Sequence, residues 1–256
     1  MTNAAHGAEL EVEVETFAHR AAPEVKVAAT IAFVVAVALV PGGSFWPYAV
    51  DAALLLTVAA VTRTPPGLMG QRLVIEVPFI LFIVLLPFVG GGETTDVLGL
   101  ALSTDGLQAA GHIAAKATLA VQATGILMAT TQPAAILAGC ERLRVPRQLT
   151  AIAGFALRYL QVVLAELRRM QAARVARGDD PRWLWQARAV AQSAGALTVR
   201  CFERGERVHG AMLARGFEGS MPDVVLSERG TRAAWALALA LPVPAVLATL
   251  LARVPA

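Results

Sequence analysis

Two copies of the triplet Ala-Arg-Gly lie in the most basic part of this sequence, at Ala176-Arg177-Gly178 and Ala214-Arg215-Gly216. Glycine commonly ends a helix, because it adopts the left-handed conformation just past the last turn. Arginine in that last turn is favoured by the negative end of the helix dipole. A guanidinium at a helix end forms a forked pair with a carboxylate or a phosphate. One copy would indicate only a helix cap, but two copies predict a pair of docking points for an acidic partner.

Each triplet closes a stretch with helical periodicity. In the first stretch, apolar residues at steps of three and four indicate one helix face: Leu157, Leu160, Leu164 and Leu167. This helix is predicted to stop at Gly178-Asp179-Asp180-Pro181, where glycine and proline coincide. A second face begins near Trp183 and consists of Val190, Ala194, Leu197, Cys201, Gly205, Val208 and Met212. On this second helix, Glu203 has the spacing to pair with Arg200 and Arg207.

The charge of the chain is unevenly distributed. Between Cys140 and Ser220 there are fourteen arginines and seven acidic residues, although the net charge of the whole chain is only +3. A local excess of positive charge favours an acidic protein partner or an anionic membrane surface.

Composition places the chain among integral membrane proteins. Of the 256 residues, 56% are hydrophobic and 16% are charged, against roughly 25% charged in a typical soluble protein. The two cysteines and four histidines are scattered and match no metal-site spacing. The sequence contains no phosphate-binding P-loop. We therefore expect no catalytic residue, no bound metal and no cofactor of its own. Acidic first residues, Glu9 to Glu15, argue against a cleavable signal peptide.

Five apolar runs predict transmembrane helices, since a bilayer core needs about 20 residues per helix. The runs are Val25–Val40, Tyr48–Thr62, Leu73–Val89, Ile113–Gly139 and Ala233–Leu251. Arg63 and Arg72 follow the second run, only acidic residues follow the third, and the arginine-rich segment follows the fourth. The positive-inside rule then puts the N-terminus, the Arg63–Arg72 loop and residues 141–228 in the cytoplasm.

The predicted fold is an all-α integral membrane protein with about five transmembrane helices and cytoplasmic amphipathic coupling helices inserted before the last span. Its parts are an N-terminal arm (1–22), helices one to four (23–140), the coupling-helix segment (141–228) and the last transmembrane helix (229–256). We expect Glu93–Gly111 to be a polar connection. Asp51, Glu76 and Lys116 lie near span ends, where we expect them to snorkel to the interface, with a functional role as the alternative.

Residues Arg158 to Gly219 resemble the transmembrane coupling (T) component of energy-coupling factor (ECF) transporters. Both Ala-Arg-Gly triplets carry this resemblance. The stretch from Arg200 through Glu203-Arg204-Gly205-Glu206-Arg207 to Phe217 is similar to the cobalt-type CbiQ group of the family. The membrane part matches the family only in the number and placement of its spans.

The resemblance implies a non-enzymatic subunit of an uptake transporter in the bacterial plasma membrane. Such a subunit couples ATP hydrolysis by two ATPase subunits, or one ATPase in two copies, to a separate substrate-binding membrane subunit. Arg177 and Arg215 carry over as the docking residues, and their flanking Ala and Gly provide the helix-end geometry. ATP and Mg are expected on the ATPases. The implied substrate is cobalt ion, with nickel or a vitamin as alternatives.

Three other functions compete with this interpretation. A membrane enzyme is suggested by Asp105-Gly106-x-x-Ala109, which is similar to the aspartate motif of lipid-linked alcohol phosphotransferases. However, Ala110 stands where that motif needs Arg, and its later aspartates are absent. Nucleic-acid binding is disfavoured by the interleaved acids and the lack of a known motif. A basic membrane scaffold for an acidic partner would not distinguish Arg177 and Arg215 from Arg188.

Overall fold

The chain forms two compact units. The computed structural model describes residues 21–89, 94–97, 100–178, 187–218 and 230–253. The membrane unit comprises Met1–Leu143 and Ser227–Ala256, and the hairpin unit comprises Arg144–Leu226. The hairpin unit therefore interrupts the membrane unit, and the chain crosses between the two units twice. The acidic segment Glu9–Glu15, the predicted helix stop at Asp179–Pro181 and the predicted helix start near Trp183 lie outside the described residues.

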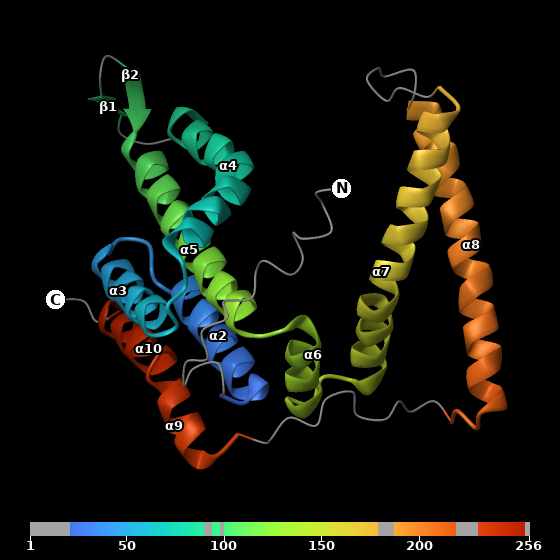
Figure 1. Cartoon of the computed structure of the whole chain (residues 1–256). Helices are drawn as coiled ribbons and strands as arrows, with labels where there is room; N and C mark the ends of the chain where they lie inside the picture. The colour runs from blue at the N-terminus through green and yellow to red at the C-terminus, as the bar shows by residue number, and fades with distance from the viewer. Residues whose placement is uncertain (1–20, 90–93, 98–99, 179–186, 219–229, 254–256) are drawn as a thin grey trace. The chain divides into compact units, whose positions relative to one another are not determined.

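Helices build almost the whole of the described chain (Figure 1). The membrane unit contains α2 (Pro23–Ala38), α3 (Trp46–Val61), α4 (Pro66–Val89), α5 (Thr104–Thr130), α6 (Pro133–Arg142), α9 (Arg232–Leu239) and α10 (Pro242–Leu251). Thr104–Thr130, Arg147–Ala176 and Arg232–Leu251 are each long and apolar enough to cross a membrane, and α3 is a shorter apolar helix. Arg147–Ala176 belongs to the hairpin unit, which the sequence analysis predicted to be cytoplasmic, so its length and composition do not distinguish it from a membrane span. The all-α membrane fold predicted from the sequence is confirmed.

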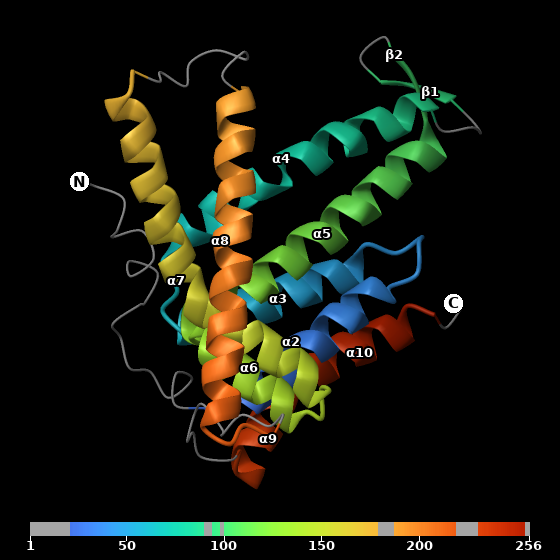
Figure 2. The same cartoon turned by 90° about the vertical axis from the view of Figure 1, so that its right-hand side faces the viewer.

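The core of the membrane unit lies where α2, α3, α5 and α10 meet. Phe33, Val37 and Ala245 are 0–1% exposed and belong to one cluster of buried residues. In this cluster Tyr48 and Leu55 come from α3, and Leu119 and Ile126 come from α5. Helix α4 packs along α5, and Figures 1 and 2 show these two helices as neighbours leading to the same strand pair. The membrane unit thus closes around its own apolar side chains.

The connection before α5 contains secondary structure that the sequence analysis did not describe. Residues Thr94–Val97 (β1) and Leu100–Ser103 (β2) form an antiparallel pair within the predicted polar connection. Helix α5 then begins at Thr104, where the Ser103 hydroxyl accepts a hydrogen bond from the Gly106 N–H at 3.2 Å. The helix therefore begins at Thr104, before the apolar run that begins at Ile113. The capping side chain of Ser103 satisfies a backbone donor that would otherwise be unpaired.

The fourth predicted span, Ile113–Gly139, is wrong as one continuous helix. Helix α5 ends at Thr130 and α6 starts at Pro133. Gln132 has an extended backbone (φ −62, ψ 145), because a proline disfavours the helical conformation in the residue before it. The helices therefore break at this point, although the apolar composition continues through it.

The snorkelling expected of polar residues in the spans is also wrong for two of them. Asp51 is 0% exposed, on the same side of α3 as the core residues Tyr48 and Leu55. Glu76 is buried and accepts a 2.7 Å hydrogen bond from the Thr118 hydroxyl of α5. Lys116 instead donates to the Ala38 and Val40 carbonyls, at 2.9 Å each, at the end of α2. The carboxylates turn into the helix bundle because inward-facing polar groups avoid lipid.

The hairpin unit consists of two long antiparallel helices, α7 (Arg147–Ala176) and α8 (Ala187–Ala214) (Figures 1 and 2). The predicted seam of α8 faces α7, because Cys201, Val208 and Met212 line a groove between the helices. On α7, however, the groove is lined by Phe155, Tyr159 and Val163 rather than by the predicted leucine face. Two members of that leucine face, Leu157 and Leu160, are exposed.

Candidate functional site

The first Ala-Arg-Gly triplet forms the C-terminal cap of α7. The helix ends at Ala176, and Arg177 is its C-cap residue. Gly178 has φ +84, a left-handed conformation that glycine adopts without strain. Its N–H donates to the Val175 carbonyl at 3.0 Å, and the Arg177 N–H donates to the Arg174 carbonyl at 2.9 Å. These bonds satisfy carbonyls that a helix end would otherwise leave unpaired.

The second triplet repeats this geometry at the end of α8. Gly216 has φ +80, and its N–H donates to the Leu213 carbonyl at 3.0 Å. The next N–H, of Phe217, reaches back to the Met212 carbonyl at 3.0 Å, which completes a Schellman motif. Phe217 and Met212 both line the groove between α7 and α8, as the apolar contact of that motif requires. The two triplets therefore place their arginines at the same position of a helix end.

Each cap carries an exposed arginine and, in the same turn, an exposed apolar side chain. Arg177 and Arg215 are exposed, and neither guanidinium makes an ion pair or hydrogen bond with the residues that the structure describes. Two residues before each arginine stands an exposed aliphatic side chain, Val175 in one cap and Leu213 in the other. Arginine is enriched among the residues that dominate binding energy at protein interfaces, whereas valine and leucine are under-represented. The sequence analysis missed this second element, which the repeat of an aliphatic residue before Ala-Arg-Gly could have indicated.

The two caps lie at opposite ends of the hairpin. Because α7 and α8 are antiparallel, the C-terminus of one helix lies near the N-terminus of the other (Figure 1). A helix rises about 1.5 Å per residue, so the 28 residues of α8 separate the caps by about 42 Å. A single acidic site of ordinary size does not span that distance, and the arrangement fits two separate receiving sites.

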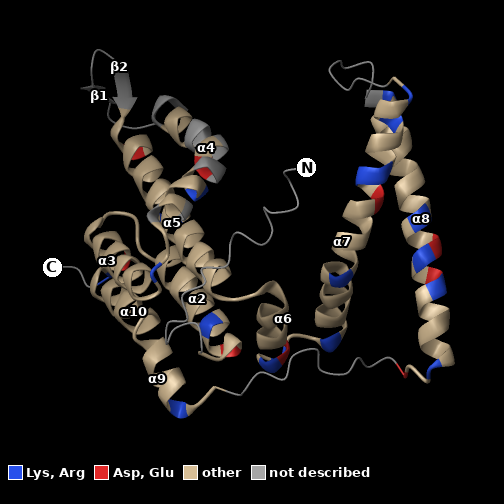
Figure 3. Ribbon diagram, viewed as in Figure 1, with Lys and Arg blue, Asp and Glu red and all other residues tan. Residues whose placement is uncertain are grey.

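Charged residues recur along both hairpin helices, whereas α2, α3, α5 and α10 carry few (Figure 3). Glu166 of α7 connects the helices: one carboxylate oxygen accepts a hydrogen bond from Arg200 of α8, and the other accepts one from Arg169 at 2.8 Å. The hydrogen bond from Arg200 lowers the pKa of Glu166, and the positive charge of Arg169 lowers it further. The sequence spacing predicted a pair between Arg200 and Glu203 on the same helix. Arg200 instead pairs with Glu166 across the hairpin.

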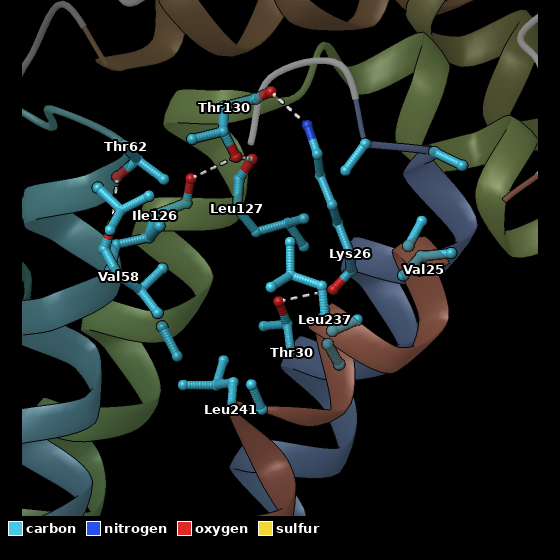
Figure 4. A pocket seen from close by; sticks show the side chains of 18 of the residues that line it. Val25, Lys26, Thr30, Val58, Thr62, Ile126, Leu127, Thr130, Leu237 and Leu241 are labelled. Atoms are coloured by element: carbon cyan, nitrogen blue, oxygen red, sulfur yellow. Dashed lines mark hydrogen bonds between the residues drawn. The ribbon is translucent and has the colours of Figure 1, made fainter. Parts of the chain in front are cut away.

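The membrane unit has a hollow of its own, with a volume of about 500 Å³. It is bordered by α2, α3, α5 and the length of α9, and its walls are mainly aliphatic (Figure 4). Lys26 extends along it and donates to the Thr130 carbonyl at the end of α5, at 3.1 Å. Among the described residues, no three His, Cys, Asp or Glu side chains are grouped so that they could hold a metal ion.

Comparison with known proteins identifies the family. The CbiQ family model, described as "Cobalt transport protein", matches residues 14–224. The chain is 31% identical over 205 residues to the cobalt transport protein CbiQ of Rhodobacter capsulatus, covering 76% of this chain and 80% of that protein. It is 28% identical over 228 residues to the energy-coupling factor transporter transmembrane protein EcfT of Bacillus selenitireducens, covering 80% of this chain and 81% of that protein. For EcfT of Listeria innocua the identity is 25% over 215 residues, covering 78% of this chain and 80% of that protein.

These matches agree with the membrane fold. The apolar helices define an integral membrane protein, and the matched relatives are transport proteins. The chain belongs to the CbiQ family and is a T component of the type found in ECF transporters.

Proposed function

We propose that this chain is the transmembrane coupling subunit of an ECF-type uptake transporter. In this proposal it transmits ATP-driven motion from two cytoplasmic ATPase subunits, or from one ATPase in two copies, to a separate substrate-binding membrane subunit. It has no catalytic role, and ATP and Mg bind to the ATPases. The N-terminus and residues 141–228 face the cytoplasm, where the hairpin unit meets the ATPases.

The observation that carries the proposal is the repetition of one cap at both ends of the hairpin. Arg177 and Arg215 are exposed C-cap residues, each followed by a left-handed glycine and preceded by an exposed aliphatic side chain. A left-handed glycine is ordinary at a helix end, but a single cap does not require the exposed arginine and the exposed aliphatic side chain that recur here. Two equal docking points about 42 Å apart suit two equal partners, each offering a carboxylate to one guanidinium. A forked arginine–carboxylate pair fixes orientation as well as affinity.

Cobalt ion is the substrate that we propose. The family description and the Rhodobacter capsulatus relative both name cobalt transport. Two of the relatives are named only as energy-coupling factor proteins, so nickel or a vitamin is the alternative substrate. In either case we expect the partner membrane subunit to bind the substrate. Among the described residues of this chain, no three His, Cys, Asp or Glu side chains are grouped so that they could hold a metal ion.

Affinity purification from native membranes in mild detergent, followed by mass spectrometry, tests this function. We expect two P-loop ATPase chains, or one in two copies, and a small membrane subunit to remain bound. Cells expressing the complex should then accumulate radioactive cobalt in preference to nickel. A stable protein purified without an ATPase would contradict the coupling role and would favour the basic scaffold.

A further inference from the structure

One buried carboxylate joins three segments of the membrane unit. Glu24, in the first turn of α2, is 7% exposed. Its Oε2 atom accepts a 2.8 Å hydrogen bond from Arg142 Nη1 at the end of α6, which is also an ion pair. Its Oε1 atom accepts a 2.8 Å hydrogen bond from the backbone N–H of Gly230, two residues before α9. Both oxygens are therefore engaged by different segments of the chain.

Two glycines allow this close approach. A Cβ atom on Gly139 of α6 would lie 2.9 Å from the Glu24 backbone nitrogen and 3.0 Å from the Pro23 carbonyl carbon. A Cβ atom on Gly230 would lie 2.5 Å from a methyl group of Val25. The atoms near Gly139 belong to the backbone of Pro23 and Glu24, so no side-chain rotation could relieve the clash. The start of α2 thus holds α6 and the start of α9 at distances that only glycine permits.

The residues that contact Glu24 lie on either side of the hairpin unit in the sequence. The hairpin unit is Arg144–Leu226, so Arg142 lies just before it and Gly230 just after it. Helix α9 packs mainly on α2, because the apolar hollow separates it from α3 and α5 (Figure 4). The last residues before the hairpin unit and the first described residue after it therefore contact the same carboxylate of α2.

We propose that Glu24 is a positioning residue that transmits movement of the hairpin unit to the membrane helices. This inference rests on the coupling function proposed above. A displacement of the hairpin pulls on the chain at Arg142 and at Gly230, and both pulls reach the first turn of α2 through Glu24. Helix α2 in turn contributes Phe33 and Val37 to the core that it shares with α3, α5 and α10. Movement at the hairpin then displaces the bundle as a unit.

The test compares transport with ATP hydrolysis in the reconstituted transporter. Glu24→Gln keeps the size of the side chain and an acceptor oxygen but removes the ion pair with Arg142. We expect the variant to retain its ATPases and to hydrolyse ATP, while transporting about tenfold less substrate per ATP, the lower end of what loss of a hydrogen bond to a charged group produces. Arg142→Gln should behave alike, and Arg142→Lys should restore part of the coupling. Arg144→Gln is the control, because Arg144 is exposed and outside this contact.

A second readout uses the full chain in detergent without partners. Hydrogen exchange of the Gly230 amide should accelerate by about tenfold to a hundredfold in Glu24→Ala, which removes its acceptor. Gly139→Ala, which changes no charge, should also accelerate it by forcing α6 away from α2. Unchanged exchange in both variants would overturn the proposed contact.

The outcomes separate this inference from the proposed function. Faster exchange with a wild-type ratio of transport to hydrolysis would reduce Glu24 to a structural tie and overturn its role in coupling. If the wild-type chain retains no ATPase, the proposed function fails and the coupling role of Glu24 fails with it. In that case the exchange measurement still decides whether the contact exists.

Discussion

The two units of this protein bury their apolar side chains to very different extents. In the membrane unit, Phe33, Val37 and Ala245 are almost inaccessible, and even the polar side chain of Asp51 is fully buried. In the hairpin unit, Thr150 is the buried residue of α7, and no described residue of α8 is buried. Phe202 of α8 is 70% exposed and Leu160 of α7 is 47% exposed.

This difference indicates what each unit is built for. The membrane unit has a packed core, and its exposed apolar side chains, such as Leu56 and Leu251, lie on apolar helices for which lipid is the expected surrounding. A helical hairpin with exposed aliphatic and aromatic side chains on several faces requires other molecules to cover them, since large exposed apolar patches mark interaction sites. In α7 the Phe155–Tyr159–Val163 face meets α8, and the leucine face remains available. We therefore expect the hairpin unit to present a surface for partners.

The strongest test of this comparison is charge reversal at both caps. Loss of one partner of a desolvated charge pair costs about 2–5 kcal/mol of binding. Arg177→Glu or Arg215→Glu should therefore weaken one side of the complex, and the double variant should release the ATPases altogether. Co-purification of ATPase with the tagged chain measures the effect.

Arg188→Glu is the matched control for these reversals. Arg188 is exposed on α8 but is not a cap residue, so its reversal should leave the complex intact. Thermal melting of each variant alone in detergent confirms that the fold survives. Wild-type ATPase retention in the Arg177→Glu, Arg215→Glu double variant would refute docking through the caps.

The next prediction uses one kind of substitution in both units. Phe33→Ala should lower the stability of the membrane unit by about 3 kcal/mol, because it leaves a cavity in a packed core. The effect belongs at the low end of the usual range, since lipid is as apolar as the lost ring and mainly packing is removed. Phe202→Ala should change stability by at most about 0.5 kcal/mol. Melting in detergent measures both, and equal losses would contradict the contrast between the units.

A smaller effect distinguishes glycines within the hairpin itself. Gly216→Ala places a side chain at φ +80, which costs about 1–2 kcal/mol for an L-residue. Gly210→Ala lies inside α8 with open space around it and should stabilise the helix by about 0.8–1 kcal/mol. The two changes should therefore shift the melting temperature in opposite directions. A shift of the same sign would show that Gly216 does not define the cap.

The helix ends were predictable from the sequence because their causes are local. Gly178 and Gly216 follow periodic stretches directly, and α7 and α8 end where this pattern predicts. The break at Gln132 was missed because the count followed apolar composition, although Pro133 carried the signal. The docking role of Arg177 and Arg215 stays a prediction.

The contact at Glu24 could not be predicted in this way. Its two hydrogen bonds join residues that are 118 and 206 positions apart, and no local pattern connects such positions. The inner face of α7 was missed for a different reason. Phe155, Tyr159 and Val163 follow each other at steps of four, and the predicted leucine face has steps of three and four. Helix α7 therefore has two apolar faces. Periodicity alone does not decide which of two faces meets a neighbour.

The smallest predicted effect concerns how the hairpin is held together. The pKa of Glu166 is lowered, chiefly by the hydrogen bond from Arg200 and further by the charge of Arg169. A carboxylate with a lowered pKa stabilises the folded state above its ordinary pKa of about 4.3, and this contribution is lost as the pH falls through the folded-state pKa. The wild-type hairpin should therefore lose stability on acidification, and added salt should reduce the effect because the pair is exposed.

Glu166→Gln should remove this part of the pH dependence. The variant should melt slightly below the wild type at neutral pH, and the two curves should converge in acid. Glu203→Gln is the control, because Glu203 forms no ion pair within the described part of the chain, so its profile should run parallel to the wild type. If Glu166→Gln instead follows the wild type throughout, Arg200 does not hold α8 against α7. The apolar groove from Phe155 to Met212 would then be the contact that sets the hairpin.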